Sequence, residues 1–469
     1  MLCILSGHFT GIVYASLTMQ TQTSQTPQSK VRTRRHLNAD ALIKGVRDIF
    51  KGIVERRAER NGISLVDVLM SALAVFLLKS PSLLDFDRRK GVEEHNIKKV
   101  YGVKKIPCDT QMRTRLDPLD PGTIRPAYQE VFRRLQRGKI LEEMTFFDGY
   151  YIVSLDGTTY FFSDKLYSPA CLEKHSSKTG KISYNLQMLG AAIVHPDRRE
   201  VIPLPPEFIR KQDGQTKNDC ERNDCRRWLE EFRKEHPHLK IIITEDGLSS
   251  NAPHIRDLME YDCRFILGVK ESDHAYLFEC LNEAAKKGLV SDYTIQDSSN
   301  PKVQHRFRFA NGIPPNKSNQ DLLVNVLEYW EITEDKIQYF SWITDFTLTS
   351  DNVYQIMRGG RARWKIENET FNTLKNQGYH LEHNYGLGQQ NLSMVFVQLM
   401  MLAFLIDQTQ QLSCALFQKA WEKSGCKREL WNNIRSVFRY FMVESMEALY
   451  RIIILGPQRH KLVLIEDTS

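Results

Sequence analysis

Cysteine is scarce in this sequence, and its scarcity excludes two classes of small, cross-linked protein. Nine cysteines are spread over 469 residues, their number is odd, and none belongs to a Cys-x-x-Cys pair. A disulfide scaffold needs a dense, even set of cysteines, and a zinc ribbon needs closely spaced pairs. We therefore expect reduced thiols in a cytoplasmic protein.

Charge is missing from the amino terminus, and long hydrophobic runs are missing throughout. The first 27 residues carry no charge, so the apolar stretch 1–18 lacks the basic flank of a secretory signal. The polar, low-complexity stretch 20–26 predicts a disordered tail that extends to residue 37, with Met19 as an alternative start. Met394–Ile406 is too short and too interrupted to cross a bilayer, so we expect no membrane association.

Positive charge is concentrated in the first third of the chain. Residues 28–140 contain 25 Lys and Arg against 13 Asp and Glu, whereas residues 141–469 contain 39 against 44. A basic front on a mildly acidic body is expected where an N-terminal region meets a polyanion such as nucleic acid. A solvated basic face is the alternative interpretation.

The periodicity of the apolar residues changes from helical to strand-like near Phe146. Before this residue the pattern predicts helices, including one that Ser64 caps and that runs to about Leu78. After it come Tyr151–Leu155 and two more strands, followed by helix, strand, helix and strand. The fourth strand, Leu239–Thr244, is continuously apolar and β-branched, as a strand buried on both faces should be. This order is typical of an RNase H-like core, in which the first and fourth strands are neighbours.

Three carboxylates occupy the positions where such a core would need them. Asp156 ends the predicted first strand, Asp246 ends the fourth, and Glu367 lies on a helix predicted from Ser350 through Asn376. Oxygen ligands of this kind suit hard cations, and a pair of cations can hold the attacking and leaving oxygens of a phosphoryl transfer. An Asp-Gly turn or a helical Glu alone would be unremarkable, so the prediction rests on their order and placement together.

Three motifs resemble those of DDE transposases of the bacterial insertion-sequence-four-like superfamily. They are Ser154-Leu155-Asp156-Gly157-Thr158-Thr159, Thr244-Glu245-Asp246-Gly247-Leu248 and Arg363-Trp364-Lys365-Ile366-Glu367-Asn368. The family pattern separates Tyr, Arg, Glu and Lys by two, three and six residues. Arg363 and Glu367 match this pattern, whereas Gly360 stands at the Tyr position and Lys375 lies one residue beyond the Lys position.

The resemblance implies an α/β fold with an RNase H-like catalytic core that a β-rich insertion interrupts, flanked by helical regions. We divide the chain into a disordered tail (1–37), a basic helical DNA-binding domain (38–145), the first part of the core (146–273), the insertion (274–346), the completion of the core around Glu367 (347–383) and a helical C-terminal region (384–469).

By the same resemblance, Asp156, Asp246 and Glu367 are expected to be catalytic and to bind two Mg²⁺ or Mn²⁺ ions. The implied reaction is cleavage at insertion-sequence ends followed by strand transfer to target DNA, in the cytoplasm and associated with the nucleoid. Double-stranded DNA is the implied partner, and the chain is expected to act as a homodimer in a synaptic complex, with the C-terminal helices, including Met394–Leu405, as contacts.

Five further residues are candidates for contacting DNA. Arg363 would reach a phosphate, or instead form a salt bridge with a neighbouring carboxylate, and Lys375 lies near the same helix face. Trp364 would stack on a base or fill the gap between helix and sheet. Lys174 and His175 belong to a basic loop that contacts DNA or is a solvated hairpin.

Two other functions are compatible with these motifs. One is a catalytically inactive or degenerate DNA-binding protein derived from a transposase. The other is a metal-dependent nuclease that hydrolyses DNA without strand transfer.

Overall fold

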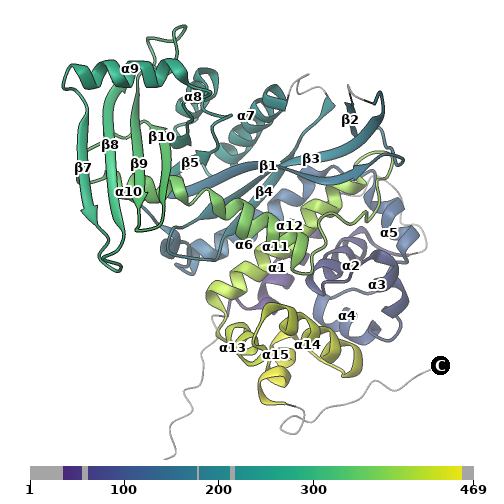
Figure 1. The fold of residues 1–469 in the computed structure, drawn as a ribbon. Coiled ribbons are helices and arrows are strands. Elements are labelled where there is room, and N and C mark those ends of the chain that lie inside the picture. The colour runs from purple at the N-terminus through teal and green to yellow at the C-terminus, as the bar shows by residue number, and fades with distance from the viewer. Residues whose placement is uncertain (1–34, 55–61, 177–178, 212–216, 457–469) are drawn as a thin grey trace, which may run out of the picture. The chain divides into compact units, whose positions relative to one another are not determined.

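A large mixed sheet and many helices make up the part of the chain that the computed structural model describes, which is residues 35–54, 62–176, 179–211 and 217–456 (Figure 1). The fold is therefore mixed α/β, in agreement with the class predicted from the sequence. The tail predicted for residues 1–37 lies outside the described residues except at its end.

Helices fill the described residues between 39 and 144, as their periodicity predicts. They are α1 (Ala39–Phe50), α2 (Leu65–Leu77), α3 (Leu83–Arg89), α4 (Glu94–Tyr101), α5 (Asp109–Leu116) and α6 (Arg125–Arg137), with the 3-10 turns η1 (Pro121–Ile124) and η2 (Leu141–Met144). The predicted cap of α2 is confirmed, because the Ser64 hydroxyl accepts a hydrogen bond from the Asp67 N–H. Nearly all of α2 is buried.

The strands after these helices form one sheet. They are β1 (Tyr151–Ser163), β2 (Leu172–His175), β3 (Ile182–Val194), β4 (Ile202–Phe208), β5 (Ile241–Glu245), β6 (Arg264–Gly268), β7 (Ser291–Gln296), β8 (Gln304–Ile313), β9 (Val324–Ile332) and β10 (Ile337–Thr344). Their order is β2-β3-β1-β5-β6-β10-β9-β8-β7, and β4 also pairs with β3. Helices α7 (Lys217–Glu235), α8 (Ala252–Glu260) and α9 (Ala275–Lys286) connect several of the strands.

The centre of the sheet has the pairing predicted from the order of its elements. β1 is parallel to β5 and antiparallel to β3, and β5 is parallel to β6. β5 is buried along its whole length, as its β-branched sequence predicts. The first strand is longer than predicted, because β1 pairs with β3 as far as Ser163. The prediction that this strand ends at Asp156 is therefore wrong.

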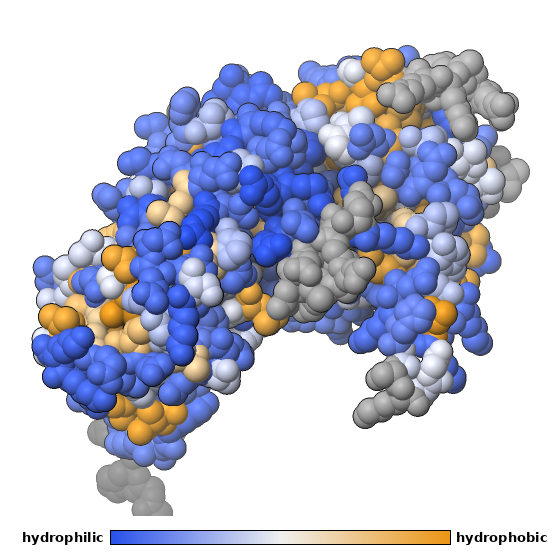
Figure 2. Space-filling view, turned by 90° about the horizontal axis from the view of Figure 1, so that it is seen from above, coloured by the Kyte–Doolittle hydropathy of each residue, from blue (hydrophilic) through white to orange (hydrophobic). Residues whose placement is uncertain are grey.

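The predicted β-rich insertion extends this same sheet. β10 pairs with β6, and β9, β8 and β7 follow in antiparallel order to form the left side of Figure 1. Apolar and polar residues alternate along β8, which is typical of strands with one face toward the core. The face of the molecule seen from above in Figure 2 is mainly hydrophilic.

The helix predicted from Ser350 through Asn376 is broken into three parts. These are α10 (Val353–Arg361), the π-helical segment η4 (Ile366–Phe371) and α11 (Asn372–Asn376). Asn352, and not Ser350, is the N-cap residue of α10. In η4 the Asn372 N–H donates to the carbonyl of Glu367, five residues earlier, which is the hydrogen-bond spacing of a π-helix.

Helix α12 is the central helix of the C-terminal region. That region contains α12 (Leu392–Ser413), α13 (Ala415–Ser424), α14 (Lys427–Tyr440) and α15 (Met446–Leu455). α12 packs against α1, α2, α5 and α6 from the N-terminal region and against β4. Met394–Leu405 is therefore almost entirely covered by the chain itself, and the prediction that this segment contacts a second subunit is wrong.

The length of α12 also changes one expectation from the sequence. By length and composition alone this 22-residue helix could cross a membrane, although 94% of its most apolar window is buried inside the structure. Core helices of globular proteins meet the same criterion.

The division of the chain into separate domains stays a prediction.

Candidate active site

The two aspartates lie side by side because β1 and β5 pair in parallel. Tyr151 is opposite Ile241, and the register continues to Ser154 opposite Thr244. Two residues further along each strand this register reaches Asp156 and Asp246, on strands about 4.8 Å apart. The predicted juxtaposition of the two side chains therefore follows from backbone pairing, although Asp156 lies within its strand and only Asp246 follows the end of one.

Glu367 is brought to the same place by the broken helix that crosses the sheet. η4 packs against both β1 and β3. The Ser154 hydroxyl donates a 3.1 Å hydrogen bond to the carbonyl of Arg363, which ties the start of this segment to β1. Gly190, opposite Asp156 in β3, lies under the Phe371 ring, where a methyl group would lie 2.5 Å from Phe371 Cε1. The missing side chain lets the helix approach the sheet.

Arg363 lies between two of the three carboxylates. Its Nη1 atom is 2.9 Å from Glu367 Oε1 and 3.8 Å from Asp156 Oδ2. The guanidinium is mostly buried, whereas the Asp156 and Glu367 side chains remain partly accessible. Of the two roles considered for Arg363, the salt bridge is the one that the structure contains.

The electrostatics of Asp156 reflect the crowding of these groups. Burial raises the pKa of its carboxyl to about 7; the Arg363 charge opposes this rise, and Glu367 and Asp246 add to it. A carboxyl that titrates near neutral pH because it is buried beside like charges is a frequent feature of functional sites. Three acidic groups that influence one another in this way favour the binding of cations.

The donor set fits hard divalent cations. Each of the three residues offers carboxylate oxygens, the ligands that Mg²⁺ and Mn²⁺ prefer. In the described part of the chain, however, the group of three whose ligand atoms all lie within 4.8 Å of one another is a different one, Cys225 with Glu245 and His254. The oxygens of the three carboxylates are thus farther apart than the ligand atoms of a single closed ion site, and Arg363 lies between two of the carboxylates.

The Glu245–His254 pair stabilises the turn that carries Asp246. Glu245 Oε2 lies 2.5 Å from His254 Nε2, and its Oε1 accepts a hydrogen bond from the Ser249 hydroxyl. Burial would lower the pKa of His254, but Glu245 raises it. The Asp246 carboxylate itself accepts the Leu248 N–H at 3.0 Å. The turn is therefore held through Glu245 by one buried and one partly buried hydrogen bond, and after Asp246 by an exposed one.

Trp364 and Lys375 lie on the same helical segment as Glu367. Trp364 is 48% exposed, so the prediction that it fills the gap between helix and sheet is wrong; the Arg363 guanidinium lies 4.5 Å from its ring centroid. Lys375 forms a 2.8 Å ion pair with Glu382.

The π-helical segment accounts for the displaced position of Lys375. In an α-helix a residue eight places on is turned by about 80°, whereas one seven places on is turned by about 20°. A π-helical turn takes up one additional residue, so Lys375 occupies the angular position that a residue seven places on would have in an α-helix.

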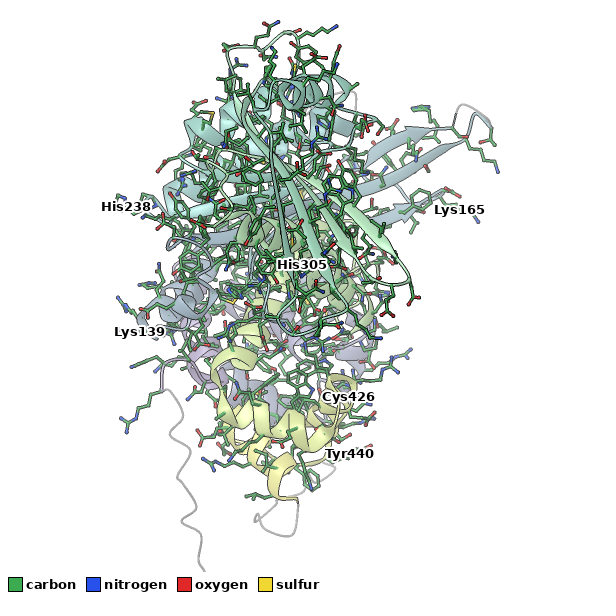
Figure 3. All side chains as sticks on the ribbon, turned by 60° about the vertical axis from the view of Figure 1, so that its left-hand side comes forward. Lys139, Lys165, His238, His305, Cys426 and Tyr440 are labelled. Atoms are coloured by element: carbon green, nitrogen blue, oxygen red, sulfur yellow. The ribbon has the colours of Figure 1, made fainter. Side chains whose placement is uncertain are left out.

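Lys174 and His175 are not part of this cluster. Both are exposed on β2, where Lys174 pairs with Ser183 of β3. Asp156 pairs with Gly190, seven residues further along β3 and so about 23 Å away. Figure 3 shows the neighbouring Lys165 on this projecting part of the sheet, away from the main body.

Several contributors to the site were not predicted from the sequence. Ser154 and Gly190 act through contacts with residues far away in the chain, so no local pattern identifies them, and His254 contacts Glu245, nine residues earlier. Glu245 had a detectable signal, because a charged residue that ends a fully apolar strand needs a buried partner. Gly360 is also explained: a Cβ at this position would clash with Trp342 Nε1, which leaves no room for the Tyr of the family pattern.

Comparison with known proteins adds little to this description. No protein-family model and no curated protein matches the chain. Among solved structures it is similar to the cryo-EM structure of a piggyBac transposase synaptic complex with hairpin DNA, at 12% identity and a TM-score of 0.38, over 92% of this chain and 84% of that one. A likeness at this level supports no conclusion about activity, and the insertion-sequence-four-like family stays a prediction.

Proposed function

We propose that this chain is a DNA transposase that cleaves the ends of an insertion sequence and joins them to target DNA. The observation that carries the proposal is the convergence of Asp156, Asp246 and Glu367 from three distant parts of the chain, with Arg363 between Asp156 and Glu367. The strand order β4-β3-β1-β5-β6 supports it, because three antiparallel strands followed by two parallel ones are the arrangement expected of an RNase H-like core.

Asp156, Asp246 and Glu367 would hold two Mg²⁺ or Mn²⁺ ions. When bound, such ions polarise the scissile phosphate and activate water or a 3′-hydroxyl. The wide spacing of the three carboxylates suits two ions better than one. Because burial raises the pKa of Asp156 to about 7, a bound cation would have to displace a proton from this carboxyl near neutral pH, and its binding would strengthen as pH rises.

Arg363, Trp364 and Lys375 would contact DNA beside the carboxylates. Cation binding would weaken the Arg363 salt bridges and free its guanidinium for a phosphate, a geometry that suits its planar donors. The half-exposed Trp364 offers a ring on which a base can stack. Lys174 and His175 would contact DNA beyond the site, from the projecting strands. The protein would act on double-stranded DNA as a homodimer in the cytoplasm.

Two alternatives keep the same site. A degenerate transposase would bind DNA without cutting it, and a metal-dependent nuclease would cut without joining. The hydrogen-bonded supports of Glu367 and Asp246 favour an intact site over a degenerate one.

An end-joining assay separates these functions. Purified protein is incubated with Mg²⁺, a labelled duplex that carries the flanking ends of its own genomic locus, and a supercoiled target plasmid. The proposal predicts cleaved ends and covalently joined plasmid product. Cleavage without joining would establish the nuclease, and binding without cleavage would establish the degenerate protein.

A further inference from the structure

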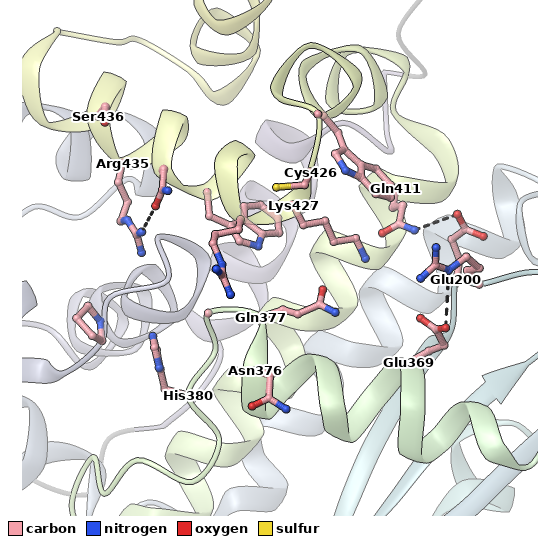
Figure 4. Close-up of a pocket in the computed structure, with 18 of the residues that line it drawn as sticks. Glu200, Glu369, Asn376, Gln377, His380, Gln411, Cys426, Lys427, Arg435 and Ser436 are labelled. Atoms are coloured by element: carbon pink, nitrogen blue, oxygen red, sulfur yellow. Dashed lines mark hydrogen bonds and ion pairs between the residues drawn. The ribbon is translucent and has the colours of Figure 1, made fainter.

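A large cavity lies on the other side of the Glu367 helix from the sheet. Its volume is about 1520 Å³, and its walls come from α14, α3, the β3–β4 connection and the end of α11. Lys427 and Arg435 project into it from α14, opposite Asn376 and Gln377 (Figure 4). Glu369, two residues after Glu367, also lines it. The cavity and the carboxylate site therefore share one helical segment.

One face of α14 lines this cavity and carries cations but no carboxylate. Its residues recur at helical spacing: Arg428, Asn432, Arg435, Ser436 and Arg439. The opposite face supplies most of the buried apolar residues of the helix, whereas the buried Trp431 borders the cavity. A helix with one apolar face and one face of guanidinium and hydrogen-bonding groups is adapted to a polyanion. The acidic residue of the first turn, Glu429, does not line the cavity.

The acidic residues of the facing walls are already paired. Asp85 binds Arg89 at 2.8 Å, Glu143 binds Arg198 at 3.0 Å, and Glu369 lies 3.8 Å from Arg199. Glu200 accepts a hydrogen bond from Gln411, and Asp197 binds Arg358.

The cations of α14 have no such partners. Among the described residues, Lys427, Arg428, Arg435 and Arg439 form no ion pair with a carboxylate. Arg435 instead donates to the carbonyl of Lys79 and to Asn432. Among the described residues that line the cavity, the cations without a carboxylate partner are thus those of α14.

The start of α14 adds to this positive potential. Lys427 and Arg428 occupy the first turn, where unpaired N–H groups and the helix dipole favour an anion. The N-cap residue, Cys426, supplies no side-chain hydrogen bond to this turn. Burial lowers the pKa of Lys427, and the charges of Glu369, Asp407 and Glu200 oppose this shift only in part.

We infer that the α14 face binds the phosphate backbone of duplex DNA at a site distinct from the carboxylates. The inference rests on the proposed function for its choice of polyanion. Eleven residues separate Arg428 from Arg439, or about 16 Å along the helix, which matches about five phosphates of one strand at about 3.4 Å each. DNA held here lies beside the helical segment that carries Glu367, so this face positions the substrate.

The salt dependence of DNA binding tests this inference. Binding of a random-sequence duplex to the full chain is measured by fluorescence anisotropy over a range of salt concentrations. Arg428 and Arg439 are exposed, so the double variant Arg428→Ala/Arg439→Ala is expected to fold normally, which thermal melting verifies. Loss of two phosphate contacts should reduce the slope of log K against log salt by about 1.8, and Arg428→Lys/Arg439→Lys should restore it.

The control removes the same charge from a neighbouring surface. Lys419 and Lys423 are exposed on α13 and lie outside the cavity, so Lys419→Ala/Lys423→Ala should leave the slope unchanged. An unchanged slope in the arginine variant, or an equal drop in the control, would overturn the inference. If cleavage depends on Asp156, Asp246 and Glu367 but the slope of the arginine variant is unchanged, only the α14 site is overturned. If the arginine variant lowers the slope as expected but the protein does not cleave DNA, the α14 site stands and the proposed reaction is overturned.

Discussion

Among the three carboxyls of the candidate site, Asp156 is the one whose pKa is clearly changed by folding. Its neighbours are fixed by backbone pairing and by the Ser154–Arg363 hydrogen bond, so it cannot move away from the other acidic groups. Without a bound cation, burial and the neighbouring acidic groups favour the protonated carboxyl, whereas the charge of Arg363 favours the ionised one. Functional sites commonly retain such destabilising groups.

Asp156→Asn should therefore stabilise the metal-free protein at high pH. Folding raises the pKa of this acid from 3.8 to about 7, so between these values the native state binds more protons than the unfolded state. Stability is thus lost as pH rises through this window, and the loss is complete above about pH 7. Its upper limit is about 4 kcal/mol.

Urea unfolding in EDTA measures this effect at about pH 5 and about pH 8. The difference in unfolding free energy between Asp156→Asn and wild type should be larger at the higher pH. Asp351→Asn, which alters an exposed carboxylate near α10, should show no such trend. A difference that does not change with pH would show that folding does not raise the pKa of Asp156.

At the scale of elements, the contact between η4 and the sheet places Glu367. Gly190→Ala should push Phe371 away from β3, because the added methyl has no space beneath the ring. We expect a loss of about 1–3 kcal/mol in unfolding free energy, together with slower DNA cleavage. Both are measurable by urea unfolding and by cleavage rates with Mg²⁺.

In the double variant Gly190→Ala/Phe371→Leu, the smaller leucine leaves space for the added methyl group. This variant should therefore recover the cleavage that Gly190→Ala loses. If Gly190→Ala alone cleaves at the wild-type rate, the close approach of helix and sheet is not needed to position Glu367.

The type and order of the helices and strands were predicted more reliably than the residues at which they begin and end. The order of strands and helices around Asp156 and Asp246 follows from apolar periodicity. The length of β1 does not, because Asp156-Gly157 is a local turn signal that pairing with β3 overrides. The break between α10 and η4 is likewise decided by tertiary contacts, since the Arg363 carbonyl bonds to Ser154 and not within the helix alone.

At the scale of the whole molecule, a buried ion pair joins the N-terminal helices to α12. Lys79 Nζ lies 2.6 Å from Asp407 and also donates to the carbonyls of Phe76 and Leu77. Tyr379 donates to the same carboxylate. The N-terminal helices and α12 thus share one core. Local sequence patterns could not indicate this, because the contact joins residues 328 positions apart.

Asp407→Ala should destabilise the protein by about 3–5 kcal/mol, because it leaves the Lys79 charge buried without a partner. The matched control is Asp48→Ala, which breaks the half-exposed pair with Lys51 at the same 2.6 Å distance. That change should cost no more than about 1 kcal/mol. Similar losses of unfolding free energy in urea for the two variants would show that the buried pair does not hold the regions together.

The measurement that tests the central claim most directly is DNA cleavage by single variants of the three carboxylates. Asp156→Asn, Asp246→Asn and Glu367→Gln are compared with wild type on a duplex that carries the flanking ends of the genomic locus, with Mg²⁺ and with EDTA. If the three side chains form one active site, wild type cuts only with Mg²⁺, and each variant loses at least about 10³-fold in rate while Asp351→Asn cuts normally. Wild-type cleavage by any one of the three variants would contradict a shared site.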